Sequence, residues 1–300
     1  MAARRCPKCR FLEPVDAGEP VWRLGWSCPA CGNAVAQRDG IPMFAPELAD
    51  TVSGFEPADF DFLAEVEANH FWFATRSKLI VGLADKFFPG AASFLEVGCG
   101  TGAVLREMLR SRRWDRIAGS ELHTLGLVHA RTRMPKGVEF VQMDALNIPA
   151  VDLFDLTGAF DVVEHIADDE AVLRGLREAT RRGGGVILTV PQHRWLWSEA
   201  DVRAHHQRRY ESGELETKLG RNGFEVLFSS SFTALLLPLM AVSRLRARKG
   251  GNENRVDREF AMHPLANAVF KAILGCEVRL TLAGLRWPMG GSRVVVARAI

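Results

Sequence analysis

From residue 93 onward, short β-rich segments alternate with segments of helical periodicity, and this alternation limits the fold more than any other feature of the sequence. The β-rich segments span residues 93–97, 116–121, 138–144, 154–160, 185–190, 225–230 and 293–298. Strands that are joined by helices form a parallel sheet with helices on both faces, and such a sheet binds its ligand at the carboxyl ends of the strands. We therefore predict a doubly wound α/β sheet of seven strands.

A glycine-rich segment follows the first of these strands. In residues 94–102, FLEVGCGTG, the glycines Gly98, Gly100 and Gly102 alternate with other residues just before a helical segment. Glycines at this position let backbone amides approach a bound nucleotide closely. With Ala103 the segment also fits the looser dinucleotide pattern Gly-x-Gly-x-x-Gly/Ala, so the glycines alone do not separate methyl transfer from hydride transfer.

Acidic residues at the ends of the first three strands make that distinction. Glu96 precedes the glycines by two positions, Glu121 ends the second strand, and Asp144 ends the third. Carboxylates accept hydrogen bonds from ribose hydroxyls and attract a cationic sulfonium, whereas they repel a pyrophosphate. A lone acid at a strand end is usually just solvated, but three acids at matching positions disfavour that alternative.

Together these motifs resemble the class I S-adenosylmethionine (SAM)-dependent methyltransferases, especially bacterial methyltransferase-domain proteins, in stretches such as residues 141–144, 160–166 and 190–193. The resemblance implies a Rossmann-like sheet. It also implies that the first acid organises the loop near the methionine amino group, the second binds the ribose hydroxyls, and the third meets the adenine amine. The cofactor-binding residues expected from it are Glu96, Gly98, Cys99, Gly100, Gly102, Glu121, Leu122, Asp144, Ala145 and Phe160.

Asp161, Glu164 and His165 follow the fourth strand, where the methyl group meets its acceptor in this fold. We predict that these three residues are catalytic, with His165 as a general base that the two acids orient. Their D-x-x-E-H pattern also resembles the E-x-x-E-H of ubiquinone-pathway O-methyltransferases, whose acids and histidine bind a divalent cation, with Asp161 in place of the first Glu. The alternative is that Glu164 caps the next helix and His165 packs under the cofactor.

A basic segment follows the fifth strand. Its residues His206, Arg208, Arg209 and Tyr210 are the predicted substrate-binding set, because guanidinium groups hold phosphate or carboxylate bidentately. The alternative is a solvated basic face, or ion pairs that close this segment onto Glu or Asp.

Four cysteines near the N-terminus form two C-x-x-C pairs, Cys6 with Cys9 and Cys28 with Cys31. Their spacing is typical of four thiolates around a zinc ion, which is structural because no ligand position stays open. The alternative is redox or incidental cysteines. We predict a small zinc ribbon over residues 1–46 that folds on metal binding. It resembles ribbons fused to other methyltransferases, including ones that act on RNA.

The remaining boundaries follow from composition. Residues 47–92 form a linker and a helical cover, residues 93–231 the SAM-binding core, residues 232–291 a helical insertion, and residues 292–300 the last strand of the sheet. The insertion holds an apolar run followed by a basic tract over residues 233–249. Four roles are open for such a segment: contact with a membrane surface, closure over a lipid-linked acceptor, a dimer interface, or packing on its own domain.

Composition adds little to the assignment of function. The 38 Lys and Arg residues nearly balance the 36 Asp and Glu residues, which argues mildly against nucleic acid as a partner. We expect a cytoplasmic enzyme, or one at the membrane periphery, that transfers a methyl group from SAM to O or N of a small or lipid-linked metabolite. Two alternatives stay open: an RNA methyltransferase that uses the ribbon for recognition, and a non-catalytic scaffold with a vestigial SAM site.

Overall fold

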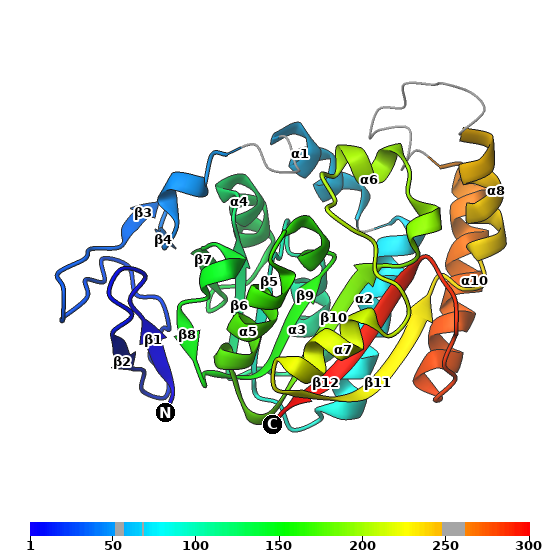
Figure 1. The fold of residues 1–300 in the computed structure, drawn as a ribbon. Coiled ribbons are helices and arrows are strands. Elements are labelled where there is room, and N and C mark those ends of the chain that lie inside the picture. The colour runs from blue at the N-terminus through cyan, green and yellow to red at the C-terminus, as the bar shows by residue number, and fades with distance from the viewer. Residues whose placement is uncertain (52–56, 68, 248–261) are drawn as a thin grey trace.

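The computed structural model describes residues 1–51, 57–67, 69–247 and 262–300. A central sheet runs through the molecule, with the N-terminal segment beside one edge and two helices, α8 (Leu237–Ala247) and α10 (Pro264–Leu282), beside the other (Figure 1). Within the described residues the sheet has nine strands in the order β11-β12-β10-β9-β5-β6-β7-β4-β3.

Seven of these strands coincide with the β-rich segments of the sequence. They are β5 (Ser93–Val97), β6 (Arg116–Glu121), β7 (Glu139–Gln142), β9 (Phe154–Phe160), β10 (Thr180–Pro191), β11 (Phe224–Phe232) and β12 (Ser292–Ala299). The first five are parallel to one another, whereas β12 runs antiparallel between β10 and β11. The Rossmann-like α/β fold that the alternation predicts is confirmed.

Helices cover both faces of this sheet. The remaining helices are α1 (Pro57–Val66), α2 (Phe71–Phe87), α3 (Ala103–Ser111), α4 (Thr124–Arg133), α5 (Asp169–Ala179), α6 (Glu199–Arg203) and α7 (Glu214–Arg221). In Figure 1, α5 and α7 lie on one face, while α2 and α3 lie on the other. The amphipathic pattern explains the packing, since α3 buries Val104, Leu105 and Met108 and leaves its charged residues outside.

The N-terminal segment adds two strands to the edge of the seven predicted core strands. β3 (Ala36–Arg38) and β4 (Ile41–Met43) form a hairpin whose turn residues Asp39 and Gly40 both have positive φ, as a type I′ turn requires. β4 then pairs in parallel with β7, through Met43 and Gln142. The physical reason is that β7 would otherwise be an unpaired edge strand.

A second, smaller sheet also joins the ribbon to the core. It consists of β1 (Ala3–Arg5), β2 (Leu12–Pro14) and β8 (Ala150–Val151), with β1 between the other two. Trp22 stacks on Phe154 with ring centroids 6.0 Å apart, and Trp26 stacks on Phe44 at the same distance. A segment this short has little core of its own, so its aromatic residues share the core of the main sheet.

Gln142 is the polar centre of this junction and is completely buried. Its Oε1 accepts a hydrogen bond from the backbone N–H of Ala45 (3.1 Å), and its Nε2 donates to the carbonyls of Ala45 (2.7 Å) and Leu122 (3.0 Å). One side chain therefore ties the N-terminal segment to the loop that follows β6.

The insertion at residues 232–291 holds α8 and α10. Phe71 links α2 to α10, because its ring meets Phe270 at 5.4 Å and its backbone N–H donates to Asn267 Oδ1 at 2.8 Å. Residues 248 and 249 of the predicted basic tract, like residues 52–56 of the predicted linker, lie outside the described residues. Of the helices described, none has the length and apolar character needed to cross a bilayer.

We expect Gln142→Ala to lower the free energy of unfolding by about 2–4 kcal/mol, because the substitution leaves buried backbone groups of Ala45 and Leu122 without partners. Chemical denaturation of the full chain measures this. Gln37→Ala, at an exposed position of β3, is the matched control and should change the value by less than about 0.5 kcal/mol. Equal effects of the two substitutions would contradict the assignment.

Candidate functional site

The glycine loop begins where β5 ends, at the carboxyl edge of the parallel strands. Gly98, Gly100 and Gly102 have φ values of 71°, 51° and 84°, a region that favours glycine over other residues. A Cβ on Gly98 would overlap the side chain of Val162, in the loop after β9. Glycine is therefore required both by the backbone conformation and by the close packing of the two loops.

Glu96 lies beneath this loop and is only 2% exposed. Its Oε2 has no hydrogen-bond partner within the described part of the chain. Burial raises the pKa of Glu96 to about 8, although the nearby Arg76 opposes the shift. A buried carboxyl of this kind is suited to receive the positive charge of a ligand.

Glu121 braces the glycine loop from the neighbouring strand. Its Oε2 accepts a hydrogen bond from the backbone N–H of Gly100 at 3.0 Å, and its Oε1 accepts one from Leu122 at 2.7 Å. Cys99 is buried in the same loop, and its N–H donates to the carbonyl of Ser120 at 2.8 Å. The structure thus brings the predicted cofactor residues of β5 and β6 together.

The other predicted cofactor residues lie at the ends of β7 and β9. Asp144 caps the 3₁₀ turn η2 (Ala145–Asn147), where its Oδ1 accepts a hydrogen bond from Leu146 N at 2.9 Å. Ala145 is the first residue of that turn, and Phe160 is buried at the last position of β9. Since β5, β6, β7 and β9 are adjacent parallel strands, all these residues share one edge of the sheet.

Glu67 is a residue at this site that the sequence did not single out. It follows α1, accepts a hydrogen bond from the hydroxyl of Thr101, and lies 3.6 Å from Arg133 Nη1. Burial raises its pKa. The helical cover over the glycine loop is therefore anchored by a carboxylate, which the prediction of a linker and helical cover over residues 47–92 did not identify.

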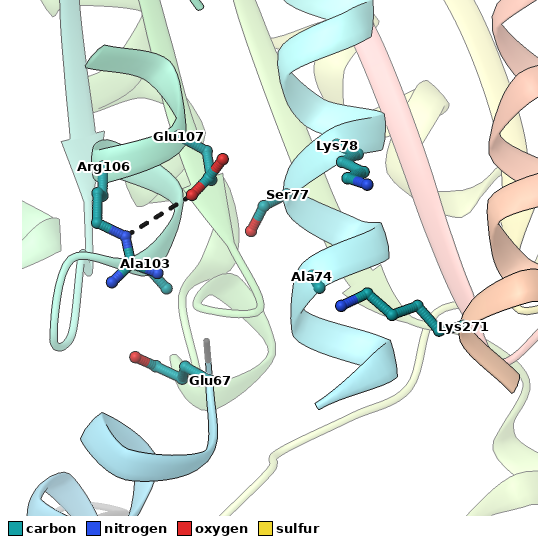
Figure 2. Close-up of a pocket in the computed structure, with 8 residues that line it drawn as sticks. All are labelled: Glu67, Ala74, Ser77, Lys78, Ala103, Arg106, Glu107 and Lys271. Carbon is teal, nitrogen blue, oxygen red and sulfur yellow. Dashed lines mark ion pairs between the residues drawn. The ribbon is translucent and has the colours of Figure 1, made fainter. Parts of the chain in front are cut away.

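A polar pocket lies beside the glycine loop, between α2, α3 and α10 (Figure 2). Its lining residues are Glu67, Ala74, Ser77, Lys78, Ala103, Arg106, Glu107 and Lys271. None of the three carboxylates predicted to bind the cofactor lines it. The lining of this pocket therefore includes no residue of the predicted cofactor-binding set.

The structure divides the predicted catalytic set. Asp161 has a positive φ of 58° and forms an ion pair with Arg76 of α2, and it also accepts a hydrogen bond from Thr189 Oγ1 at 3.0 Å. The role of Asp161 in orienting His165 stays a prediction, since the partners of its carboxylate in the structure are Arg76 and Thr189. Arg76 and Asp161 are 85 positions apart in the sequence, so no local pattern indicated that they pair.

Glu164 and His165 lie in a 3₁₀ turn, η3 (Val163–His165), and meet a residue of the segment after β10. The ring of His206 packs edge-on against that of His165, with centroids 4.7 Å apart. Ligand atoms of Glu164, His165 and His206, which we name the acceptor-side triad, all lie within 4.8 Å of one another. The structure thus brings one predicted substrate-binding residue to two predicted catalytic ones.

Burial dominates the electrostatics of the triad. Glu164 is completely buried, which raises its pKa well above the ordinary value, and the charge of Asp161 adds to the shift. Burial lowers the pKa of His165 to about 4, so its imidazole is neutral at pH 7. The alternative role of Glu164 as a helix cap is wrong, because Asp168 caps α5 through a 3.0 Å hydrogen bond to Ala171 N.

The other predicted substrate-binding residues have internal partners. Arg209 is 7% exposed and binds Asp201 bidentately at 2.7 and 3.0 Å. Arg208 Nη1 and the buried Tyr210 hydroxyl both meet Asp169 Oδ2, at 3.1 and 2.6 Å. We therefore correct the expectation that these three residues hold the substrate: they fasten the segment to the domain, as the ion-pair alternative stated.

Asp201 is the partner that sequence reasoning missed. Burial acts to raise its pKa, but hydrogen bonds from His206 and Arg209 outweigh that effect and leave the pKa below its ordinary value. Asp201 also completes a capping box with Ser198 at the start of α6. The pattern Ser-x-x-Asp was the sequence signal that could have drawn attention to it.

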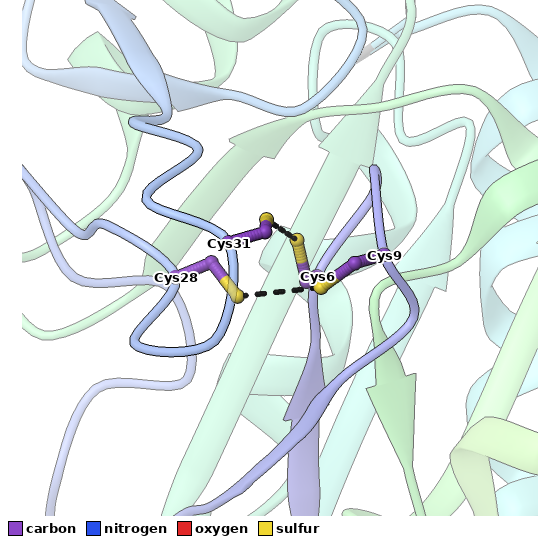
Figure 3. A group of neighbouring side chains, drawn as sticks. All are labelled: Cys6, Cys9, Cys28 and Cys31. Carbon is purple, nitrogen blue, oxygen red and sulfur yellow. Dashed lines mark hydrogen bonds between the residues drawn. The ribbon is translucent and has the colours of Figure 1, made fainter.

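The four N-terminal cysteines converge at one point (Figure 3). Cys6 Sγ lies 3.7 Å from Cys31 Sγ, and Cys9 Sγ lies 3.5 Å from Cys28 Sγ. Sulfurs that bind one tetrahedral zinc ion at about 2.3 Å each are separated by about 3.8 Å. The cluster therefore fits a structural zinc ion closely.

Comparisons with known proteins agree with this geometry. Residues 68–228 match the profile of the family described as "Methyltransferase domain". No curated protein matches the chain. Among solved structures, a complex between the Haloferax volcanii Trm112 methyltransferase activator and a methyltransferase gives a TM-score of 0.54 at 15% identity, over 81% of this chain and 93% of that chain. A geranyl diphosphate methyltransferase in complex with GPP and sinefungin gives 0.51 at 11% identity, over 76% and 78%.

We expect Arg209→Gln to destabilise the chain by about 3–5 kcal/mol, because it leaves the buried carboxylate of Asp201 without its partner. Thermal and chemical unfolding measure this. Arg194→Gln, at a side chain that is 72% exposed, is the matched control and should leave stability nearly unchanged. An Arg209→Gln protein that is as stable as the natural protein would contradict the structural role of Arg209 and would favour its role as a substrate contact.

Proposed function

We propose that this chain methylates O or N of a small or lipid-linked metabolite. The premise is that the chain belongs to the methyltransferase-domain family and is a SAM-dependent methyltransferase. The contact between Gly98 and Val162 carries the proposal. Val162 belongs to the same loop as Glu164 and His165, so the loop for the methyl donor and the loop for the acceptor are packed against each other.

The cofactor carboxylates take separate roles in this proposal. Glu96 pairs with the methionine amino group, since a buried acid gains most from a cation. Glu121 meets the ribose hydroxyls from the end of β6, and Asp144 meets the adenine amine from the end of β7. The hydrogen bonds of Glu121 to Gly100 and Leu122 support its role, because they fix the carboxylate before the cofactor arrives.

Deprotonation of the acceptor falls to the acceptor-side triad. The sulfonium of SAM is already an activated methyl donor, so the protein has to align the acceptor with the methyl carbon and remove one proton. His165 is a neutral imidazole and accepts that proton. Arg76 pairs with Asp161 and so joins this loop to α2.

Charge pairing supports a metabolite as the acceptor. Arg76, Arg208 and Arg209 each have a carboxylate partner, which disfavours a cleft that grips an RNA backbone. Apolar side chains are exposed on the insertion, and this favours a lipid-linked acceptor or contact with a membrane surface. They include Leu235, Leu239, Val242, Leu265 and Val269.

The N-terminal cysteines complete the proposal as a structural zinc site. Their sulfur spacing supports zinc, and four thiolates leave no ligand position for a substrate. Cysteines that bind a metal and form no disulfide are typical of a reducing compartment, and for that reason we place the protein in the cytoplasm.

Transfer of a labelled methyl group tests the choice of acceptor. We expect purified protein with methyl-labelled SAM to label phenols, amines or isoprenoid-linked lipids, and not total RNA. The Glu96→Gln protein, with its cofactor site impaired, is the control for background labelling. Label in RNA alone would overturn the proposed acceptor class, and it would favour the RNA methyltransferase alternative. A folded protein that binds SAM but labels nothing would favour the scaffold.

The pKa of Glu96 predicts how SAM affinity depends on pH. Below a pH of about 8 its carboxyl is protonated in the free protein, so pairing with a cation must release a proton and binding weakens as the pH falls. We expect the affinity advantage of the natural protein over Glu96→Gln to shrink by up to about tenfold per pH unit below 8. The ratio of the two Kd values removes the titration of SAM itself.

Calorimetry in buffers of different ionisation enthalpy measures the proton release directly. Glu107→Gln, an acid in α3 outside the predicted cofactor set, should behave as the natural protein does. A ratio that stays constant between pH 6 and pH 9 would show that Glu96 does not pair with the cofactor.

A further inference from the structure

We propose that the acceptor-side triad, Glu164, His165 and His206, is a binding site for one divalent transition-metal ion. The site is distinct from the cysteine cluster of the ribbon. Its ligand atoms already lie within 4.8 Å of one another, although they come from two loops that are about forty residues apart in the sequence.

Glu164 supplies the first argument, because its carboxylate is buried without hydrogen bonds. It is 0% exposed, and neither of its oxygens has a hydrogen-bond partner among the residues described. Leaving a polar group in this state costs free energy, and a native protein normally gives it a partner. A cation held between Glu164 and the two histidines would be that partner.

His206 supplies the second argument, because the orientation of its ring is fixed from behind. Its Nδ1 lies 2.9 Å from Asp201 Oδ1, and Asp201 is in turn held bidentately by Arg209. The carboxylate accepts the Nδ1 proton, so Nε2 presents a lone pair to the interior. Histidines that bind metals are oriented in this manner by a carboxylate.

The separation between His206 and Glu164 fits ligands of one ion. Nε2 of His206 lies 4.0 Å from Glu164 Oε1, which is too far for a hydrogen bond. Two ligands at about 2.1 Å from a metal are about 3.4 Å apart in a tetrahedral site and about 4.2 Å apart when opposite. The backbone bond from Gln207 N to Glu164 O, 2.8 Å, holds the two loops at this distance.

The donor set indicates the class of metal. Two imidazoles and one carboxylate favour Zn²⁺, Fe²⁺, Co²⁺ or Mn²⁺ over Mg²⁺ and Ca²⁺, which prefer oxygen ligands. Three protein ligands leave a position for water or for an acceptor atom. Asp161 is not a member of this group of ligand atoms, and its carboxylate pairs with Arg76 instead.

The consequence for chemistry rests on the proposed function. An acceptor hydroxyl bound at the open position would lose its proton to solvent water more readily than a free hydroxyl does, which is what methylation of oxygen requires. With the metal bound, His165 would act as a ligand and would no longer be the group that accepts this proton. The metal site itself stands on the geometry of the three ligands, and its test needs no acceptor.

Metal content and cobalt spectra test the proposal. We expect the full chain, dialysed against Zn²⁺ and then against metal-free buffer, to retain two equivalents per chain. His206→Ala and Glu164→Gln should each retain one. Protein produced with Co²⁺ should show thiolate charge-transfer bands from the ribbon. The two variants should keep these bands and should lose only the absorption of the Co²⁺ ion bound at the acceptor-side triad.

Two controls keep the test decisive. His205→Asn changes an exposed neighbour of the triad and should keep both equivalents. Glu164→Gln removes a buried charge without changing volume, so it is expected to fold where His206→Ala does not. One equivalent in the natural protein, or two in a folded Glu164→Gln protein, would overturn the proposal. Failure of the natural protein to bind SAM would instead count against the proposed methyltransferase site.

Discussion

The close packing of the glycine loop on the loop after β9 is the constraint on which the site depends. Gly98 has no space for a side chain because Val162 fills it, and this contact sets the two loops at a fixed separation. On one side of the contact lie Glu96 and Glu121, which suit a cationic nucleoside. On the other side lie Glu164 and His165. In the proposed function the methyl donor and its acceptor meet across this contact, since methyl transfer depends on alignment more than on chemical activation by the protein.

The ribbon extends this constraint to the N-terminus. Trp26 packs on Phe44, Phe44 donates to the carbonyl of Gln142, and the side chain of Gln142 reaches Leu122 beside the predicted ribose acid. Cys6 and Cys28 lie in the same buried cluster as Trp26. The N-terminal segment is thus packed against the loop after β6, and a zinc ion in its cysteine cluster would stabilise the segment that makes these contacts.

Local patterns made part of this molecule predictable. The seven core strands, the glycine loop and the paired cysteines depend on neighbouring residues, and the sequence predicted each of them. The pairing of Arg76 with Asp161, the approach of His206 to Glu164 and the docking of β4 on β7 depend on contacts between distant segments. No spacing rule links those segments, so the catalytic set was predicted as Asp161, Glu164 and His165, whereas the structure places His206 beside Glu164 and His165 and pairs Asp161 with Arg76. The arginines after β10 were likewise assigned to substrate, because the sequence did not reveal Asp169 and Asp201 as their partners.

Calorimetric titration of the full chain with SAM, and separately with NADH, tests the central claim most directly. The two ligands fit the same glycine pattern, but only SAM brings a positive charge to Glu96 and lacks the phosphates that the strand-end acids repel. The structure predicts binding of SAM with a Kd of about micromolar order and no binding of NADH. Binding of NADH without SAM would contradict the account, because the buried acids would then have to tolerate a pyrophosphate.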